Sequence, residues 1–160
     1  MDELHTELFT AMDRFHKLRI MDMFPEMTKS DCMMLLAIER LNEKKGRSVT
    51  VSELAEKVCA KNSAVSRTLK SLEEQGLIER SVNREDRRNV YVALTKKGKE
   101  EQQRIGQTMN ELGQAVVAQM NEEDIEKLAV CLNEVYEIAR REIEKRSLKN
   151  RKESSYGKDF

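Results

Sequence analysis

The sequence predicts a mostly α-helical fold with a small β-wing, in which a winged helix-turn-helix is combined with N- and C-terminal dimerisation helices. Three observations predict this fold. Apolar residues recur at the helical period along most of the chain. Two short segments, 77–82 and 90–94, instead alternate with period two, as half-exposed strands do. Charged residues make up 36% of the chain, aromatic residues 4%, and there is one proline, a composition typical of long helices with solvated faces.

The N-terminal part of the chain predicts two helices. The first, from about residue 2 to residue 20, carries an apolar stripe on one face, formed by Leu4, Leu8, Ala11, Phe15 and Leu18. Pro25 prevents this helix from continuing. The second begins at Thr28, whose hydroxyl and the Asp31 carboxylate form a capping box. It ends at Gly46, because glycine adopts the left-handed conformation that follows a helix.

The next segment has the form of a helix-turn-helix. Thr50 and Glu53 make a second capping box at the start of a short helix. Residues 60–62 then turn the chain. A further helix covers about residues 63–75 and ends before Gly76, and its inward side consists of Val65, Leu69 and Leu72.

A hairpin and two long helices complete the chain. The two strands are joined by the polar, arginine-rich residues 83–89. One long helix carries a stripe of Ile105, Met109, Leu112 and Val116. The other begins after an Asn121 cap and carries Ile125, Leu128, Leu132, Val135 and Ala139.

We expect a single domain over residues 1–147. Within it, residues 28–98 form the winged lobe, and residues 1–24 and 100–147 form dimerisation helices. Residues 148–160 lack apolar content, so we expect a disordered tail there.

Composition excludes several classes of protein. No apolar run approaches the roughly 20 residues that span a bilayer, and no basic-then-apolar leader opens the chain, so we expect a soluble, unprocessed, cytoplasmic protein with no membrane partner. The cysteines Cys32, Cys59 and Cys131 are odd in number and far apart, which predicts neither a disulfide framework nor a metal site. There is no phosphate-binding loop and no nucleophile elbow, and the two histidines both lie on the first helix. We therefore expect no catalytic residues, no cofactor and no enzyme activity.

The net charge of zero hides an uneven distribution. Residues 61–100 hold ten Lys and Arg against six Asp and Glu, a local excess of four positive charges. The local field steers a polyanion, so the zero total does not exclude binding to nucleic acid.

The outward side of the helix over residues 63–75 is suited to reading duplex DNA. It carries small polar side chains and two cations, namely Ser63, Ala64, Ser66, Arg67 and Lys70. Small side chains allow a close approach in the major groove, and an arginine there can make a bidentate contact to guanine. The alternative is an amphipathic helix whose polar side only meets water. The capped helix before it and the hairpin after it favour DNA binding.

The hairpin tip gathers three arginines around one aspartate. Arg84, Arg87 and Arg88 would repel one another in isolation but would suit DNA phosphates or a narrow minor groove. Asp86 would aim a neighbouring arginine by pairing with its planar guanidinium. The alternative is a solvated run of charges.

These motifs resemble the MarR (multiple antibiotic resistance regulator) family of winged-helix transcription factors. The resemblance rests on SELAEKV followed by SAVSRTLKSLEEQGLIER, and on DRRNVYVALTKKGKE leading into a long helix. It implies that Ser63, Ser66, Arg67 and Lys70 face bases or phosphates. It also implies that Asp86 and Arg88 form the pair that sets an arginine in the minor groove, with Arg84 or Arg87 nearby. Asn83 departs from the acidic residue that often starts this turn in the family.

The apolar stripes at both chain ends favour an obligate homodimer that reads a palindromic double-stranded operator, and the family resemblance implies the same. Two heads related by a two-fold axis would read half-sites one helical turn, roughly 34–36 Å, apart. The alternative is that these stripes complete the core of a monomer. We expect a transcriptional regulator, and a repressor released by a small molecule.

The resemblance also implies an effector pocket between the dimerisation helices and the DNA-binding lobe. The residues proposed to line it are Met12, Phe15, His16, Arg19 and Met33. Methionines suit a lipophilic or aromatic ligand, and His16 or Arg19 would hold an anionic group. The alternative is plain core packing with a structural histidine.

Two other functions stay open. Cys32 could serve a thiol-based redox-sensing regulator, although its position differs from the first-helix cysteine of peroxide-sensing relatives. A winged helix could also act as a protein-interaction scaffold without DNA binding. The basic tip and the groove-facing serines argue against the scaffold.

Overall fold

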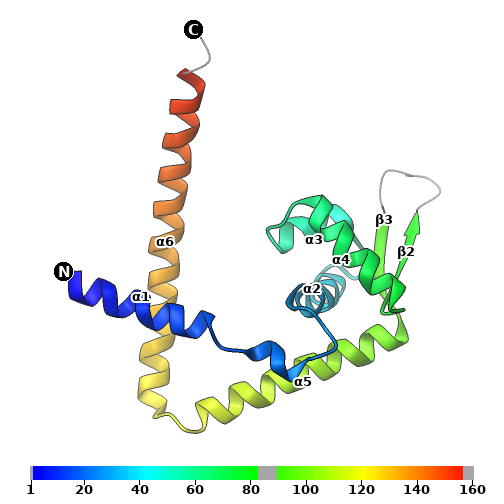
Figure 1. Cartoon of the computed structure of the whole chain (residues 1–160), viewed down its shortest axis with the longest axis horizontal. Helices are drawn as coiled ribbons and strands as arrows, with labels where there is room; N and C mark the ends of the chain where they lie inside the picture. The colour runs from blue at the N-terminus through cyan, green and yellow to red at the C-terminus, as the bar shows by residue number, and fades with distance from the viewer. Residues whose placement is uncertain (1, 83–89, 157–160) are drawn as a thin grey trace. The chain divides into compact units, whose positions relative to one another are not determined.

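The computed structural model of the chain describes residues 2–82 and 90–156 and has the predicted mostly α-helical fold with a small sheet (Figure 1). Its elements are, in order, α1 (Asp2–His16), the 3-10 helix η1 (Ile20–Met23), α2 (Lys29–Lys45), β1 (Val49–Thr50), α3 (Val51–Lys57), α4 (Asn62–Glu74), β2 (Ile78–Val82), β3 (Val90–Leu94), α5 (Lys96–Val117) and α6 (Glu122–Tyr156). Within the described ranges, no helix combines the length and apolar character needed to cross a membrane.

The chain divides into two compact units, Met1–Met109 and Asn110–Phe160, where the sequence predicts a single domain over residues 1–147. The division falls inside α5. The first unit therefore holds the winged lobe together with α1 and the first half of α5.

The predicted helix caps of α2 and α3 are present. The Asp31 amide donates to the Thr28 hydroxyl at 3.1 Å, and the Thr28 amide donates to the Asp31 carboxylate at 3.1 Å. Thr50 and Glu53 make the same reciprocal pair at the start of α3. Gly46 follows α2 with φ 63°, the left-handed conformation predicted for a glycine that ends a helix.

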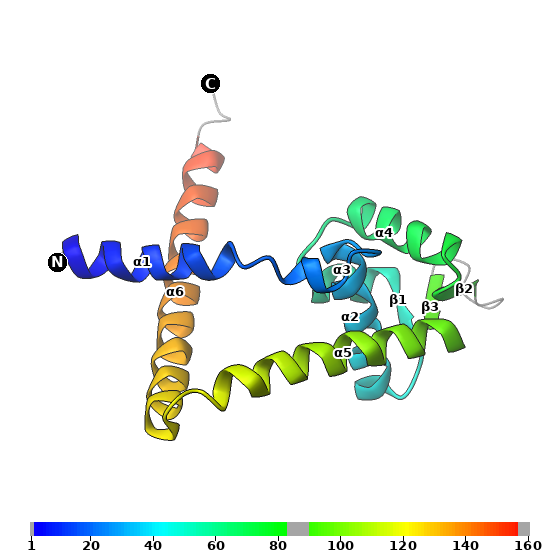
Figure 2. The same cartoon turned by 60° about the horizontal axis from the view of Figure 1, so that its bottom comes forward.

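The core of the first unit lies between α2, α3, α4 and the sheet. Leu35 and Ile38 of α2 and Leu54 of α3 are fully buried. The three residues predicted to face inward on α4, Val65, Leu69 and Leu72, are buried against them. Figure 2 shows α2 between α5 and the helix-turn-helix in the first unit.

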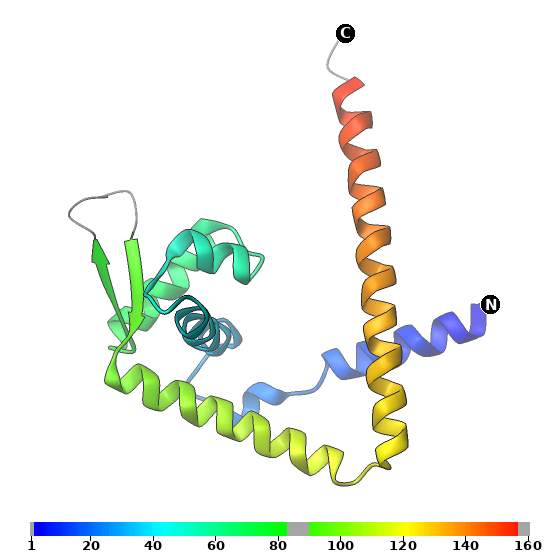
Figure 3. The same ribbon diagram turned by 180° about the vertical axis from the view of Figure 1, so that it is seen from behind.

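The sheet has three strands in the order β1-β3-β2, and both pairings are antiparallel. The predicted hairpin is present as β2 and β3, and β3 leads directly into α5 (Figure 3). The sequence does not predict β1. This strand contains only Val49 and Thr50, which pair with Val92 and Tyr91, so it is too short to display a period.

The first helix is shorter than predicted, because α1 ends at His16 and not near residue 20. The chain then forms η1 and brings Phe24, which is 1% exposed, into the core beside the half-buried Met21. The apolar pattern of the sequence predicts a helix that continues to residue 20. Burial of a phenylalanine side chain, however, contributes about 1.5–3 kcal/mol and outweighs one more helical turn.

The last helix is longer than predicted, because α6 continues to Tyr156 past the start of the tail expected at residue 148. Ion pairs stabilise the helix in the turns that precede this extension. Arg140 contacts Glu137 and Glu144 at 3.0 and 3.2 Å, and Lys145 contacts Glu142 at 2.7 Å. Glu, Lys and Arg also have high helix propensity, so a segment with little apolar content can remain helical.

Gly98 brings the first turn of α5 against the backbone of Leu77. A Cβ at position 98 would overlap the Leu77 carbonyl oxygen. We predict that Gly98→Ala lowers the free energy of unfolding by about 3 kcal/mol, because backbone atoms cannot yield as a side chain can. Gly106→Ala on the same helix is the control. Its Cβ would come no closer than 4.0 Å to another atom, so it should stabilise by up to about 1 kcal/mol. Denaturant unfolding of both variants tests this, and equal effects would contradict it.

Glu53 joins the end of α2 to the start of α3. Its carboxylate pairs with the Lys45 ammonium, accepts from Arg47 Nη2 at 2.6 Å and accepts from the Thr50 amide at 2.8 Å. The hydrogen bonds from Arg47 and then Lys45 hold the pKa of this carboxyl well below its usual range.

A depressed pKa contributes stability above the pKa of the unfolded chain, about 4.3, and this stability is lost as the pH falls below it. We predict that Glu53→Gln lowers the free energy of unfolding by about 1 kcal/mol at pH 7, after allowance for solvent screening. The difference from wild type should shrink as the pH drops from 5 to 3. Glu56→Gln, on the exposed side of α3, is the control. A pH-independent difference for Glu53→Gln would overturn this assignment.

Candidate nucleic-acid interface

The reading face of α4, defined here as Ser63, Ala64, Ser66, Arg67 and Lys70, is exposed along its whole length. The opposite side of the same helix is buried in the core. All five predicted residues therefore share one solvent-facing surface. Figure 1 shows α4 between α3 and the β2–β3 hairpin, which is the arrangement of a winged helix-turn-helix.

The N-terminus of α4 differs from those of α2 and α3. Its N-cap, Lys61, makes no side-chain hydrogen bond to the helix, and no acidic residue lies in the first turn. In α2 and α3, Asp31 and Glu53 occupy that turn. The first turn of α4 therefore supplies no carboxylate to its own amides, and the positive end of the helix dipole lies beside Ser63. Such an end suits an external anion.

The C-terminal end of α4 is fixed by the start of α5. Lys97 Nζ donates to the Gln75 carbonyl at 2.9 Å. The Thr95 hydroxyl donates to the Gly76 carbonyl at 2.7 Å, and the Thr95 amide donates to the Leu77 carbonyl at 3.1 Å. Gly76 adopts φ 72°, as expected of a glycine that ends a helix. The reading helix is thus held at its last turn while its first turn faces solvent.

The wing strands are described and its tip is not. Arg84, Asp86, Arg87 and Arg88 lie outside the described residues, so their predicted contacts with DNA remain predictions. The strands that flank them pair in register from Ile78 with Leu94 to Val82 with Val90.

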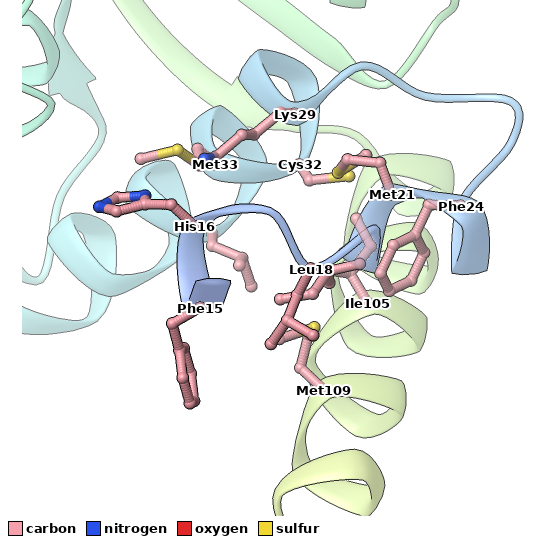
Figure 4. A pocket seen from close by; sticks show the side chains of 12 residues that line it. Phe15, His16, Leu18, Met21, Phe24, Lys29, Cys32, Met33, Ile105 and Met109 are labelled. Carbon is pink, nitrogen blue, oxygen red and sulfur yellow. The ribbon is translucent and has the colours of Figure 1, made fainter. Parts of the chain in front are cut away.

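A pocket of about 310 Å³ lies between α1, η1, α2 and α5 within the first unit. Figure 4 shows that its side chains come from several elements. The lining residues are Phe15, His16, Leu18, Ile20, Met21, Phe24, Lys29, Cys32, Met33, Leu36, Ile105 and Met109. A volume of this size with a mostly apolar lining is typical of a small-molecule site.

Three of the five predicted effector residues line this pocket, namely Phe15, His16 and Met33. Arg19 and Met12 are not among its lining residues, so their part in an effector site remains a prediction. Arg19 lies in the link after α1 and pairs with Asp22 at 3.0 Å. Lys29 is the cation that the sequence reasoning missed. Its place in the first turn of α2 could have indicated it.

Comparisons with known proteins agree with this geometry. The MarR family model matches residues 36–90, which run from within α2 to the start of β3. A stretch of 52 residues is 38% identical to YwhA, an uncharacterised HTH-type transcriptional regulator of Bacillus subtilis strain 168. This stretch covers 32% of the present chain and 37% of that regulator, so the match spans about a third of its length. Over residues 36–90 the chain is therefore similar to the MarR family.

Solved structures with MarR-type folds extend the likeness to most of the chain. S. aureus MepR in complex with DNA is 22% identical, with 82% of this chain and 94% of that chain covered and a TM-score of 0.65. Streptococcus pneumoniae FabT in complex with DNA is also 22% identical, with 88% and 95% covered and a TM-score of 0.66. At this identity the likeness establishes the shared fold alone.

Cys32, the candidate redox-sensing thiol, lies buried at the pocket wall. Burial raises the pKa of its thiol, and the neighbouring Asp31 and Glu101 carboxylates raise it further. The thiolate is the form that reacts with oxidants. This environment therefore disfavours a redox role for Cys32.

Proposed function

We propose that the protein is a homodimeric regulator of transcription that binds palindromic double-stranded DNA through the reading face of α4. The observation that carries this proposal is the solvent-facing row of serines and cations on a helix whose first turn carries no acidic residue. The match of residues 36–90 to the MarR family model supports it. Such a protein would act in the cytoplasm, where it meets genomic DNA.

Exposed apolar residues support the homodimer. Leu8, Met12 and Phe15 lie on one side of α1, and Phe15 is 76% exposed. Described by itself, α6 exposes a second stripe, formed by Leu128, Leu132, Tyr136 and Ile143. Apolar stripes of this length rarely remain in water, and a two-fold axis would pair each with its copy. The alternative is that the stripes complete the core of a monomer.

The pocket supports release of DNA by a small lipophilic or aromatic anion. Its lining is mostly apolar. Lys29 and His16 are the two basic side chains in it. An apolar ligand body would fill the cavity, and its carboxylate would pair with Lys29. We further propose that the regulator is a repressor, released when this ligand binds.

For the DNA site, we predict that Arg67→Ala lowers affinity for a duplex selected by the wild-type protein from a random library. The expected loss is about 1–3 kcal/mol and should concentrate at particular base pairs. Arg88→Ala should weaken binding to all sequences evenly and flatten the salt dependence, because a phosphate contact releases counterions. Fluorescence anisotropy at several salt concentrations measures both.

Lys127→Ala, which removes an exposed cation on α6, is the control and should leave binding unchanged. Sedimentation of the complex should give two chains per selected duplex. If the wild-type protein selects no duplex at low salt, the scaffold function replaces the regulator.

For the effector, we predict that decanoate or benzoate weakens binding of the selected duplex, while uncharged decanol acts more weakly. Lys29→Gln should reduce the carboxylate effect by about 10-fold without changing DNA affinity in its absence, because it removes only the cation at the pocket. Met33→Trp should also reduce it by filling the cavity. Titration followed by anisotropy measures the shift, and equal potency of decanol and decanoate would contradict the role of Lys29.

A further inference from the structure

Strand β2 carries an arginine at a position where the sheet faces the core. Side chains alternate along a strand, so Arg80 shares its face with Ile78, which is buried. Its partner across the ladder is Val92, which is fully buried. A charge on the inner face of a sheet is costly unless a partner compensates it.

The guanidinium of Arg80 finds its partners on the reading helix. Its Nη2 donates to the Ser66 carbonyl at 3.4 Å. Its Nε lies 3.2 Å from a carboxylate oxygen of Glu73, in an ion pair whose alignment is not that of a hydrogen bond. Ser66 and Glu73 are two turns apart on one edge of α4. Arg80 therefore contacts two groups, from residues two helical turns apart, on the edge of α4 that faces the wing.

We propose that Arg80 is a positioning residue that fixes the angle between the reading helix and the wing, and that it does not contact DNA itself. This proposal rests on the proposed DNA-binding function. The side chain is 24% exposed and its charge is balanced by Glu73. A phosphate contact would require this pair to break, whereas a positioning role uses it as it stands.

The angle matters because one duplex must meet both parts. The reading face enters the major groove, while the wing follows the backbone or the minor groove. After a small rotation of α4 relative to β2, the reading face or the wing could still contact DNA. The two could no longer contact their grooves on one duplex at the same time. Sequence-specific binding would then fall while electrostatic binding to any duplex persisted.

Two substitutions separate these roles. Arg80→Met keeps an apolar stem for the sheet face and removes both contacts to α4. Glu73→Gln removes only the ion pair. We expect each to lower the ratio of affinities for the selected duplex and for sonicated mixed-sequence DNA by about 10-fold. The salt dependence of binding to mixed-sequence DNA should stay at its wild-type slope.

Glu74→Gln is the matched control. It removes the same charge one residue later, from a carboxylate that pairs with Lys70 at 3.8 Å. We expect it to change affinity for both DNAs alike and to leave their ratio unchanged. Loss of a negative charge beside DNA strengthens binding on electrostatic grounds alone, so a lower ratio in Glu73→Gln but not in Glu74→Gln identifies positioning.

The outcomes are distinct. Equal losses for both DNAs in Arg80→Met, with a salt slope reduced by about 1, would make Arg80 a phosphate contact and overturn the proposal. An unchanged ratio in both variants, with only a lower melting temperature, would leave Arg80 a purely structural residue and also overturn it. If Arg80→Met does not fold, Glu73→Gln decides alone. A wild-type protein that selects no duplex overturns the proposed function itself, whereas selection by wild type with unaltered variants overturns only the role of Arg80.

Discussion

Burial of Val65, Leu69 and Leu72 is the constraint on which the rest of the structure depends. These three side chains are at most 1% exposed and lie at spacings of four and three residues, so they form one stripe along α4. Each contributes about 1.5–3 kcal/mol by leaving water. A rotation of α4 by one residue, about 100°, would bring Ser66 into the core and expose a leucine. The rotational setting of the reading face therefore follows from the packing of α2 and α3 against the opposite side of the helix.

The two ends of α4 differ in how their terminal backbone groups are hydrogen-bonded. At the C-terminal end, hydrogen bonds from Thr95 and Lys97 satisfy carbonyls that a helix leaves without partners. At the N-terminal end, Lys61 offers no side-chain oxygen to the free amides. Elsewhere in this lobe the chain caps such amides with Thr28 and Thr50. The contrast within one chain favours a phosphate as the partner of the first turn.

Local chemistry made much of this structure predictable from the sequence. Capping boxes and left-handed glycines act over four or five residues, so the bounds of α2, the start of α3 and the end of α4 could be predicted closely. The end of α1 could not, because the burial of Phe24 depends on residues far along the chain. Strand β1 exists only through its pairing with β3. In the candidate site, the period of α4 identified the reading face, whereas Arg80 was missed because an arginine in a strand normally indicates the outward side.

The pocket and the reading helix share one rigid element. Ile105 and Met109 line the cavity from α5, and Gly98 of the same helix packs against Leu77, just after α4. Gly98 and Ile105 are seven residues apart, or two helical turns, so a shift of one moves the other. Arg104, between them, lies 5.5 Å from the ring centroid of Phe24, which itself lines the pocket. An occupant that displaces Phe24 or Ile105 would act on the helix that holds the last turn of α4. The proposed effector would release DNA only if it bound more tightly to the protein with α5 displaced than to the protein with α5 in its DNA-binding position. That difference in binding free energy would drive the release.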